Sequence, residues 1–397
     1  MMPTSLPEHF EDFAEARREG FLQVKTLKDS GKDICGAFCQ YTPAEIIRAA
    51  GLCQVGLCGQ SAAPIKTAET RLPANLCPLI KASYGHALEE SCPYAYFSDI
   101  VVGETTCDGK KKMYELLGEL KPMQVIHLPN VPDYERSLEM WVSEIRRFTR
   151  GLEEHFHITI TEDQLNEAIE WCNKERIQAA RIYELGRYDP PAITGINMNN
   201  ITNNQQYLFD PEVKYQKINE ILDQCEENWK NGIYPYEPDP YRPRLIVSGG
   251  GYFGTSAKTV DVIEELGGAI VCYEGCCGIS SRRRLVDEDR SRDPLVRIAE
   301  KYIEVPCAVV SPNNRRLDQV RETITEWKAD GYVSITLHSC NPFAIETENI
   351  RRVCEEMGIP LLHIETDFYP GDEGQIRTRI EAFLEMVREA KKEAAHE

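Results

Sequence analysis

YFSDIVVGETTCDGKKKMYELLGELKPMQVIHL (residues 96–128) has the pattern of one strand–helix–strand unit. An apolar, β-branched run ends shortly before Cys107, and Asp108 can cap the helix that follows. A second short apolar run then predicts another strand. Such units take about 30 residues in parallel sheets. The stretch therefore predicts a parallel sheet with helices packed on its faces.

The same alternation continues on both sides of this unit. ICGAF and CQVGL predict strands on either side of a helix that ends at Gly51, and Thr42 with Glu45 forms a capping-box pattern at that helix. Further along, strands are expected at LIVSG, AIVCYE, YIEVP, GYVSITL and IPLLHIE, separated by helices near 256–266, 294–301, 316–329 and 343–356. We expect an α/β fold: two doubly wound, Rossmann- or flavodoxin-like parallel-sheet lobes plus a helical segment.

Three regions follow from these patterns. Residues 1–133 would hold an amphipathic helix over 8–29 and the first lobe. Residues 134–240 would be mainly helical, with a capping box at Thr161–Gln164, and would end in a linker rich in proline and tyrosine. Residues 241–397 would form the second lobe and a C-terminal helix over 374–393, and the two lobes could be distant structural repeats.

Composition restricts the class of partner and the compartment. The chain has 45 Lys and Arg against 64 Asp and Glu, a net charge of −19, which disfavours nucleic acid and anionic membranes as partners. No segment approaches the about 20 apolar residues of a membrane span. The acidic first residues do not resemble a signal peptide, so a cytoplasmic location is expected. There, 15 cysteines indicate metal or redox chemistry more than disulfides.

Six cysteines form two regularly spaced triplets. The first is evenly spaced, and the second recurs about once per strand–helix unit, each time after a predicted strand. Parallel sheets bind ligands at the carboxyl ends of their strands, so thiols recurring there predict an iron–sulfur centre. The six residues are Cys77, Cys92, Cys107, Cys276, Cys307 and Cys340.

The local sequence around these cysteines fits the same interpretation. Cys77 and Cys92 are each followed by proline, and Cys107 precedes a predicted helix start, where free N–H groups favour a thiolate. The lysine run 110–112 could add positive charge near Cys107, although such a run more often forms a solvated face or a partner-docking patch. Zinc is the rival metal, but its structural sites favour CxxC pairs, and none occurs in this sequence.

Other cysteines are expected to fill the protein core. CxxxC at Cys35 and Cys39 is a weak metal signal that we also read as packing. Cysteines in helical patterns, or in strands and at their edges, complete this group: Cys172, Cys225 and Cys354, and Cys53, Cys58 and Cys272.

A glycine motif, SGGGYFG, offers a second interpretation. Gly249, Gly251 and Gly254 match GxGxxG after a predicted strand, and Glu274 ends the next strand, as in a dinucleotide site. The alternative is that this backbone lies close to a cluster and donates hydrogen bonds to its sulfides. The six thiols favour the alternative.

Several stretches resemble the 2-hydroxyacyl-CoA dehydratase and benzoyl-CoA reductase superfamily. They are FCQYTPAEIIRAAG, NLCPLIKASYG, VVGETTCDGKKKMYELL, DGYVSITLHSC and GQIRTRIEAFLEM. The resemblance implies a single cubane held at Cys77, Cys107 and Cys340. SCPYAYFSD, CYEGCCG and VPCAVVSPN further resemble the double-cubane cluster proteins of that superfamily. This implies a double-cubane cluster (8Fe–9S, two linked 4Fe–4S cubanes), with Cys92, Cys307 and either Cys276 or Cys277 holding the second cubane.

The resemblance also implies an activity and a partner. Such proteins are homodimers that receive electrons from an ATP-hydrolysing 4Fe–4S reductase and reduce small molecules at very low potential. The rival functions are a subunit of a 2-hydroxyacyl-CoA dehydratase with one cubane, a non-catalytic electron carrier or cluster store, and a nucleotide-dependent dehydrogenase. Near the predicted ligands, Glu104, Lys81 and His338 are candidate proton donors, although salt bridges or hydrogen bonds would also explain them.

Overall fold

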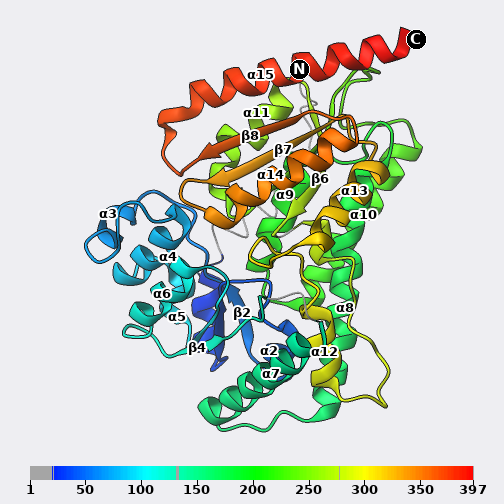
Figure 1. Ribbon diagram of the computed structural model, residues 1–397. Helices are drawn as coiled ribbons and strands as arrows, with labels where there is room; N and C mark the ends of the chain where they lie inside the picture. The colour runs from blue at the N-terminus through cyan, green and yellow to red at the C-terminus, as the bar shows by residue number, and fades with distance from the viewer. Residues whose placement is uncertain (1–19, 21, 131–133, 277, 397) are drawn as a thin grey trace. The chain divides into compact units, whose positions relative to one another are not determined.

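The computed structural model describes residues 20, 22–130, 134–276 and 278–396, which group into two compact units (Figure 1). The N-terminal unit comprises Glu19–Ile177 and Ser281–Asn313, and the C-terminal unit comprises Gln178–Ser280 and Asn314–Glu397. The division falls inside α8 (Glu162–Glu184), so the units do not follow the expected boundaries at 133 and 240.

The N-terminal unit is built on a parallel sheet with the strand order β2-β1-β3-β4. Its two central strands are buried along their whole length, as expected for a parallel sheet covered on both faces. The strands are β1 (Ile34–Ala37), β2 (Cys53–Gly56), β3 (Ile100–Glu104) and β4 (Met123–Ile126).

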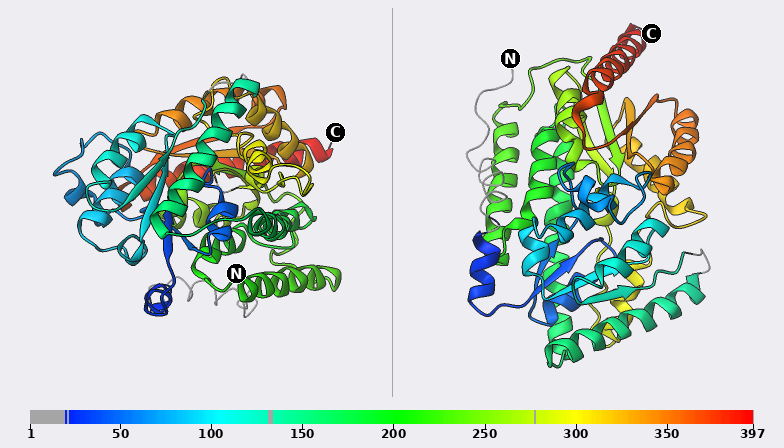
Figure 2. Two further views of the ribbon diagram at one scale, coloured as in Figure 1. Left: turned by 90° about the horizontal axis from the view of Figure 1, so that it is seen from below. Right: turned by 90° about the vertical axis from the view of Figure 1, so that its left-hand side faces the viewer.

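Helices cover both faces of this sheet (Figures 1 and 2). One group packs around α4 and the other around α7, where Trp141 and Ile145 are buried in the core. The first group contains α3 (Ile65–Ala68), α4 (Pro78–Leu88), α5 (Pro93–Phe97) and α6 (Asp108–Leu117). The second contains α2 (Ala44–Ala49), α7 (Tyr134–Phe156) and α12 (Pro294–Tyr302).

The C-terminal unit repeats the same strand order. Its parallel sheet runs β6-β5-β7-β8, so in each sheet the first strand lies between the second and the third. This shared topology agrees with the expected structural repeat and confirms the predicted α/β class with two parallel-sheet lobes. The strands are β5 (Arg244–Gly249), β6 (Ala269–Gly275), β7 (Gly331–Leu337) and β8 (Leu361–Thr366).

Two helical layers cover the sheet of the C-terminal unit (Figure 1). The first contains α9 (Gly195–Asn204), α11 (Val260–Glu265) and α15 (Glu373–His396). The second contains α13 (Asn314–Glu326) and α14 (Asn341–Glu356). The unit also includes α10 (Pro211–Lys230) and the 3-10 helices η1 (Leu185–Arg187), η2 (Gln205–Tyr207), η3 (Tyr252–Lys258) and η5 (Pro370–Asp372). The 3-10 helix η4 (Ile279–Ser281) contains the point at which the chain passes from one unit to the other. Among the described residues, no helix is both long and apolar enough to cross a membrane.

Local sequence signals explain several helix ends. The capping box at α8 is present: the Gln164 backbone N–H donates to Thr161 Oγ1 (3.3 Å), and the Thr161 N–H donates to Gln164 Oε1 (2.9 Å). Gly51 has a φ of +74° directly after the C-cap of α2, which favours glycine. Of the helix expected over 8–29, residues 22–29 are helical and most of the remainder lies outside the described residues.

Three local predictions were wrong. The capping box at α2 is absent, because Thr42 instead donates to Glu104 and Pro43 occupies the N-cap. YIEVP is not a strand: α12 ends at Tyr302, and the segment after it has no strand partner among the described residues. The helix expected over 256–266 is divided, with η3 leading into a shorter α11.

Candidate functional site

Three predicted ligands of the N-terminal unit occupy the same local position. Cys77, Cys92 and Cys107 are the N-cap residues of α4, α5 and α6. A proline at the first helical position follows Cys77 and Cys92, where its missing N–H costs no hydrogen bond. Asp108, expected to cap α6, is instead its first residue.

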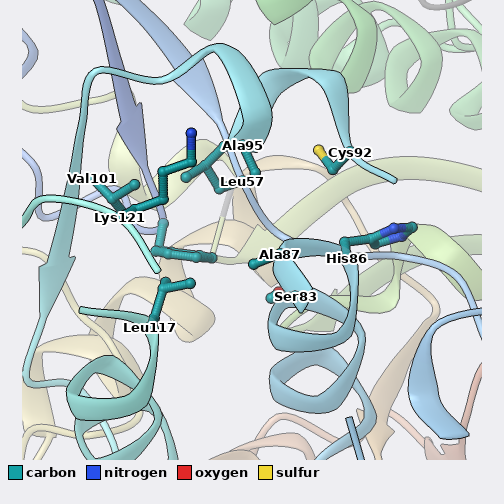
Figure 3. Close-up of a pocket in the computed structure, with 10 residues that line it drawn as sticks. Leu57, Ser83, His86, Ala87, Cys92, Ala95, Val101, Leu117 and Lys121 are labelled. Carbon is teal, nitrogen blue, oxygen red and sulfur yellow. The ribbon is translucent and has the colours of Figure 1, made fainter. Parts of the chain in front are cut away.

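Cys92 shows how such a position acts on a thiol. Burial raises the pKa of the Cys92 thiol above its usual value, and hydrogen bonds from the backbone N–H groups of Ala95 and Tyr94 offset only part of that shift. Cys92 also lines a small, mainly apolar cavity of about 10 Å³, together with His86 and Leu117 (Figure 3). That volume is close to the room needed for one water molecule.

Cys307 also belongs to the N-terminal unit, which the sequence did not predict. It is buried after α12, and its carbonyl oxygen accepts a hydrogen bond from Asn313 Nδ2 (3.0 Å). The segment that carries it is tied to α8 because Asn173 Nδ2 donates to the Val286 carbonyl oxygen (2.8 Å) and Arg176 donates to the Tyr302 hydroxyl (3.0 Å). The expected recurrence of this cysteine after a strand is therefore wrong.

The C-terminal unit holds the other two described ligand candidates at one edge of its sheet. Cys276 directly follows β6, and Cys340 is the N-cap of α14, three residues after β7. These strands flank β5, so both cysteines lie at the sheet edge that contains the glycine turn. Ser339, just before Cys340, has a φ of +60°, a strained conformation that is frequent at functional sites. Cys277, the alternative to Cys276, lies outside the described residues.

The glycine motif forms a tight turn beside Cys276. Gly249 has a φ of +152° and its carbonyl oxygen accepts a hydrogen bond from the Cys276 N–H (3.3 Å). Gly251, with a φ of +74°, is the N-cap of η3, in which Gly254 lies. A dinucleotide fingerprint places its glycines at the start of an α-helix, whereas this turn opens a 3-10 helix of seven residues.

The donor chemistry of the six cysteines fits an iron–sulfur cluster, which is bound by thiolates. Their placement at helix N-termini and strand ends fits in the same way for all but Cys307. In the described part of the chain, no three His, Cys, Asp or Glu side chains gather closely enough to hold a metal ion. Assignment of these residues as ligands therefore remains a prediction.

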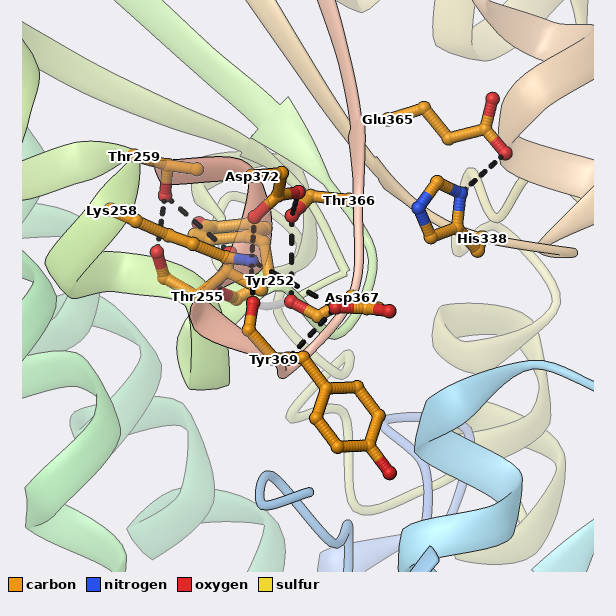
Figure 4. Close-up of polar contacts among 10 residues, drawn as sticks. All are labelled: Tyr252, Thr255, Lys258, Thr259, His338, Glu365, Thr366, Asp367, Tyr369 and Asp372. Carbon is orange, nitrogen blue, oxygen red and sulfur yellow. Dashed lines mark hydrogen bonds and ion pairs between the residues drawn. The ribbon is translucent and has the colours of Figure 1, made fainter. Parts of the chain in front are cut away.

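The three predicted proton donors lie in different surroundings. Lys81 is buried, with its ammonium group 2.7 Å from Glu69 Oε1 and 2.7 Å from the Ala74 carbonyl oxygen. His338 is exposed, and its Nδ1 lies 3.1 Å from Glu365 Oε1 (Figure 4). Lys81 and His338 therefore make the kinds of salt bridge and hydrogen bond that were the alternative to a proton-donor role.

Glu104 differs from both because it is completely buried at the end of β3. Its Oε1 accepts a hydrogen bond from Thr42, whereas Oε2 has no hydrogen-bond partner among the described residues. Burial raises the pKa of Glu104 to about 7, although Lys110 and the hydrogen bond from Thr42 act in the opposite direction. Of the two readings of Lys110, as added positive charge or as part of a solvated face, the structure disagrees with the second, because its ammonium group turns inward and donates to the Phe38 carbonyl oxygen (3.2 Å).

Buried charges in the C-terminal unit had no counterpart among the sequence predictions. Lys258 of η3 is buried and donates to Asp372 and to the Tyr369 carbonyl oxygen, while Thr366 donates to Asp372 Oδ2 (2.6 Å; Figure 4). Burial raises the pKa of Asp372, but its hydrogen bonds from Lys258 and Thr366 leave it below the usual value. A lysine after a glycine turn carries no sequence signal that would distinguish it from an exposed lysine.

The packing cysteines agree with the expectation. Cys172, Cys225 and Cys354 are buried in helices, and burial raises the pKa of all three thiols. Cys35 and Cys272 are also fully buried, in β1 and β6. The others are partly buried: Cys39, Cys53 and Cys58.

The chain is similar to several proteins named as dehydratase subunits. The family described as "2-hydroxyglutaryl-CoA dehydratase, D-component" matches residues 39–387. A "Putative dehydratase subunit YjiM" from Escherichia coli K12 is 41% identical over 97% of this chain and 99% of its own length. The "(R)-phenyllactyl-CoA dehydratase beta subunit" of Clostridium sporogenes is 26% identical over 95% and 97%. This chain therefore belongs to the 2-hydroxyglutaryl-CoA dehydratase D-component family.

Proposed function

We propose that this chain is an iron–sulfur redox enzyme that carries a double-cubane cluster (8Fe–9S) and reduces a small molecule at very low potential. Its electrons would come from an ATP-hydrolysing 4Fe–4S reductase, and the active form would be a homodimer. When bound, linked cubanes supply storage for more than one electron and a site where an iron or bridging sulfide can bind a small ligand.

One observation carries this proposal: Cys77, Cys107 and Cys340 each stand at the N-cap of a helix of at least ten residues. Free N–H groups and the helix dipole stabilise negative charge at this position, as a thiolate ligand requires. These are also the positions at which the superfamily resemblance implies the first cubane.

The second set of cysteines distinguishes the double cubane from a single one. Cys92 caps α5, Cys276 follows β6 beside the Gly249 turn, and Cys307 is held after α12. A single cubane would leave these thiols without a ligand role. The proposal assigns them to the second cubane, with Cys277 as the alternative to Cys276.

A second candidate function is supported by the names of the relatives. Proteins called dehydratase subunits match this chain over nearly its whole length, including the lactoyl-CoA dehydratase subunit beta of Anaerotignum propionicum at 23% identity. In this alternative the chain is one subunit of a hydro-lyase with a single 4Fe–4S cluster, which acts on a 2-hydroxyacyl-CoA with a second, different subunit and an activator protein. A non-catalytic electron carrier would bind iron without turning over a substrate.

Iron and acid-labile sulfide per chain, measured on protein purified without oxygen, test the two candidates. About eight irons with slightly more sulfide are expected for the double cubane, and about four irons for the single cubane. ATP-dependent reduction with a partner reductase should then require the eight-iron form. Protein that binds no iron would overturn both candidate functions. Protein that binds its full complement of iron but turns over no substrate would favour the electron carrier.

A further inference from the structure

A lysine side chain is buried in the N-terminal unit without a counterion of its own. Lys301, in the last turn of α12, is 8% exposed, and its amino nitrogen lies 3.9 Å from the centroid of the Tyr302 ring. Among the described residues, no hydrogen bond or ion pair reaches this nitrogen. A buried charge without a partner is costly, so this environment favours the neutral amine.

The carboxylate near Lys301 is already occupied. Glu45 of α2 forms an ion pair with Arg176 of α8, and its Oε2 accepts a hydrogen bond from the Tyr302 hydroxyl (3.0 Å). Arg176 donates to the same hydroxyl (3.0 Å), and its guanidinium carbon lies 5.6 Å from the centroid of the Tyr302 ring. Lys301 therefore shares this ring with a guanidinium and receives no carboxylate oxygen.

The charges around Lys301 are mainly positive. Burial, and next the charge of Arg176, lower the pKa of Lys301 well below its usual value, and Arg282 acts in the same direction. Glu45 opposes the shift, whereas the Cys172 thiol, whose own pKa is raised by burial, stays neutral. Arg282 Nε is itself buried and has no hydrogen-bond partner in the described part of the chain. The surroundings thus combine a neutral amine with an unused guanidinium donor, and both lack a negative partner.

Two kinds of ligand could supply this negative charge. A free anion such as phosphate would have to lose its hydration shell to reach these buried groups, which is costly. Carbon dioxide is small and uncharged, so it enters without that cost and becomes an anion only when it reacts with a neutral amine. Covalent addition of carbon dioxide therefore fits the buried amine better than binding of a preformed anion does.

We propose that Lys301 is a carbamate-forming site, at which dissolved carbon dioxide adds to the side-chain amine. The nitrogen lone pair forms a bond to the carbon of carbon dioxide, one C=O electron pair moves to oxygen, and one proton leaves the nitrogen for solvent. Nothing is oxidised or reduced, and the product is an anion. This carbamate would accept a hydrogen bond from Arg282 Nε and so join α12 to the segment before it. The inference does not depend on the cluster.

NMR of the full-length protein with isotopically labelled carbon dioxide tests for the carbamate directly. Wild type should show about one protein-bound carbamate per chain, and alkylation followed by peptide mass spectrometry should place it on Lys301. Lys301→Met, which keeps the length of the side chain but removes the amine, should lose the signal. Lys112→Met is the matched control, because Lys112 is exposed and pairs with Glu115 (2.6 Å). Absence of a carbamate in wild type, or its presence only at another amine, would overturn the inference.

Thermal unfolding tests the partner that the structure assigns to the carbamate. At constant pH and ionic strength, carbon dioxide at about five times its dissociation constant should raise the melting temperature of wild type by about 2–4 °C. Lys301→Met should not respond, and Arg282→Met should respond less, because the carbamate loses its counterion. Arg290→Met, in which an exposed arginine that pairs with Glu170 (2.5 Å) is removed, should respond like wild type. An equal rise with phosphate would overturn the covalent site in favour of anion binding, and a full response in Arg282→Met would overturn the role of Arg282.

Discussion

Arg316 holds Glu274 in a fully buried ion pair, in which Arg316 Nη2 lies 3.0 Å from Glu274 Oε2. The Ser248 and Tyr332 hydroxyls donate to the same carboxylate oxygen, at 2.6 Å and 2.8 Å. Burial alone would raise the pKa of Glu274, but Arg316 beside it holds the pKa below its usual value. Because Glu274 precedes Cys276 by two residues, this pair fixes the end of β6 from which that cysteine projects.

Arg316→Met is therefore expected to destabilise the protein strongly. Removal of one partner of a buried pair leaves an uncompensated charge and costs about 3–5 kcal/mol. Urea unfolding would measure the loss, and the double variant Arg316→Met, Glu274→Gln should recover part of it. Arg321→Met is the control, because Arg321 lies on the same helix in an exposed pair with Glu356 (2.7 Å). Equal effects of the two arginine variants would contradict this account.

Gly249→Ala should distort the turn beside Cys276. The added Cβ would lie 2.0 Å from the Ile335 carbonyl oxygen of the neighbouring strand, and the φ of +152° is unfavourable for alanine. Overpacking of this kind costs about 1–3 kcal/mol or more, so the melting temperature should fall. Gly371→Ala is the matched control, because a Cβ there meets nothing within 4 Å. A normal melting temperature in Gly249→Ala would show that the turn is not rigid.

The strands and their sheets could be predicted because the signals are local. Apolar runs such as GYVSITL become buried parallel strands, and alternation with helices predicts the doubly wound topology. The same argument places Cys276 and Cys340 at strand ends. The argument fails for Cys307, because the segment 281–313 is held by hydrogen bonds from Asn173 and Arg176, which lie more than 100 positions earlier in the sequence than their partners.

Long-range polar contacts explain why Thr42 and Lys110 depart from their local sequence patterns. Thr42 has the sequence context of a helix cap, but its hydroxyl pairs with Glu104, 62 residues further along the chain. Lys110 belongs to a lysine run that reads as exposed, yet it turns toward the Phe38 carbonyl oxygen. At Thr42 a long-range contact outweighs a capping preference of about 1 kcal/mol, and no pattern within one segment can reveal such a contact.

Cys92→Ser should lower the iron content if Cys92 is a cluster ligand. Serine retains the size of the side chain but supplies a hydroxyl in place of the thiolate that iron–sulfur clusters bind. Anaerobic iron and sulfide analysis with electron paramagnetic resonance would detect the change. Cys225→Ser is the control, because Cys225 is buried in α10 and should retain full iron. Unchanged iron and an unchanged spectrum in Cys92→Ser would remove Cys92 from the ligand set.

The stability of the protein should depend on pH through Glu104. Burial raises the pKa of Glu104 to about 7 from a usual 4.5, with Lys110 and Thr42 opposing the shift. Because the folded protein binds this proton more tightly than the unfolded chain, ionisation destabilises the fold as the pH rises from 4.5 to 7, by about 3 kcal/mol once complete.

Glu104→Gln carries no titrating group at this site. Its free energy of unfolding relative to wild type should therefore increase by about 3 kcal/mol across that interval and stay constant above it. Urea unfolding at a series of pH values would measure this difference. A flat difference for Glu104→Gln would mean that Glu104 titrates like an exposed carboxyl group.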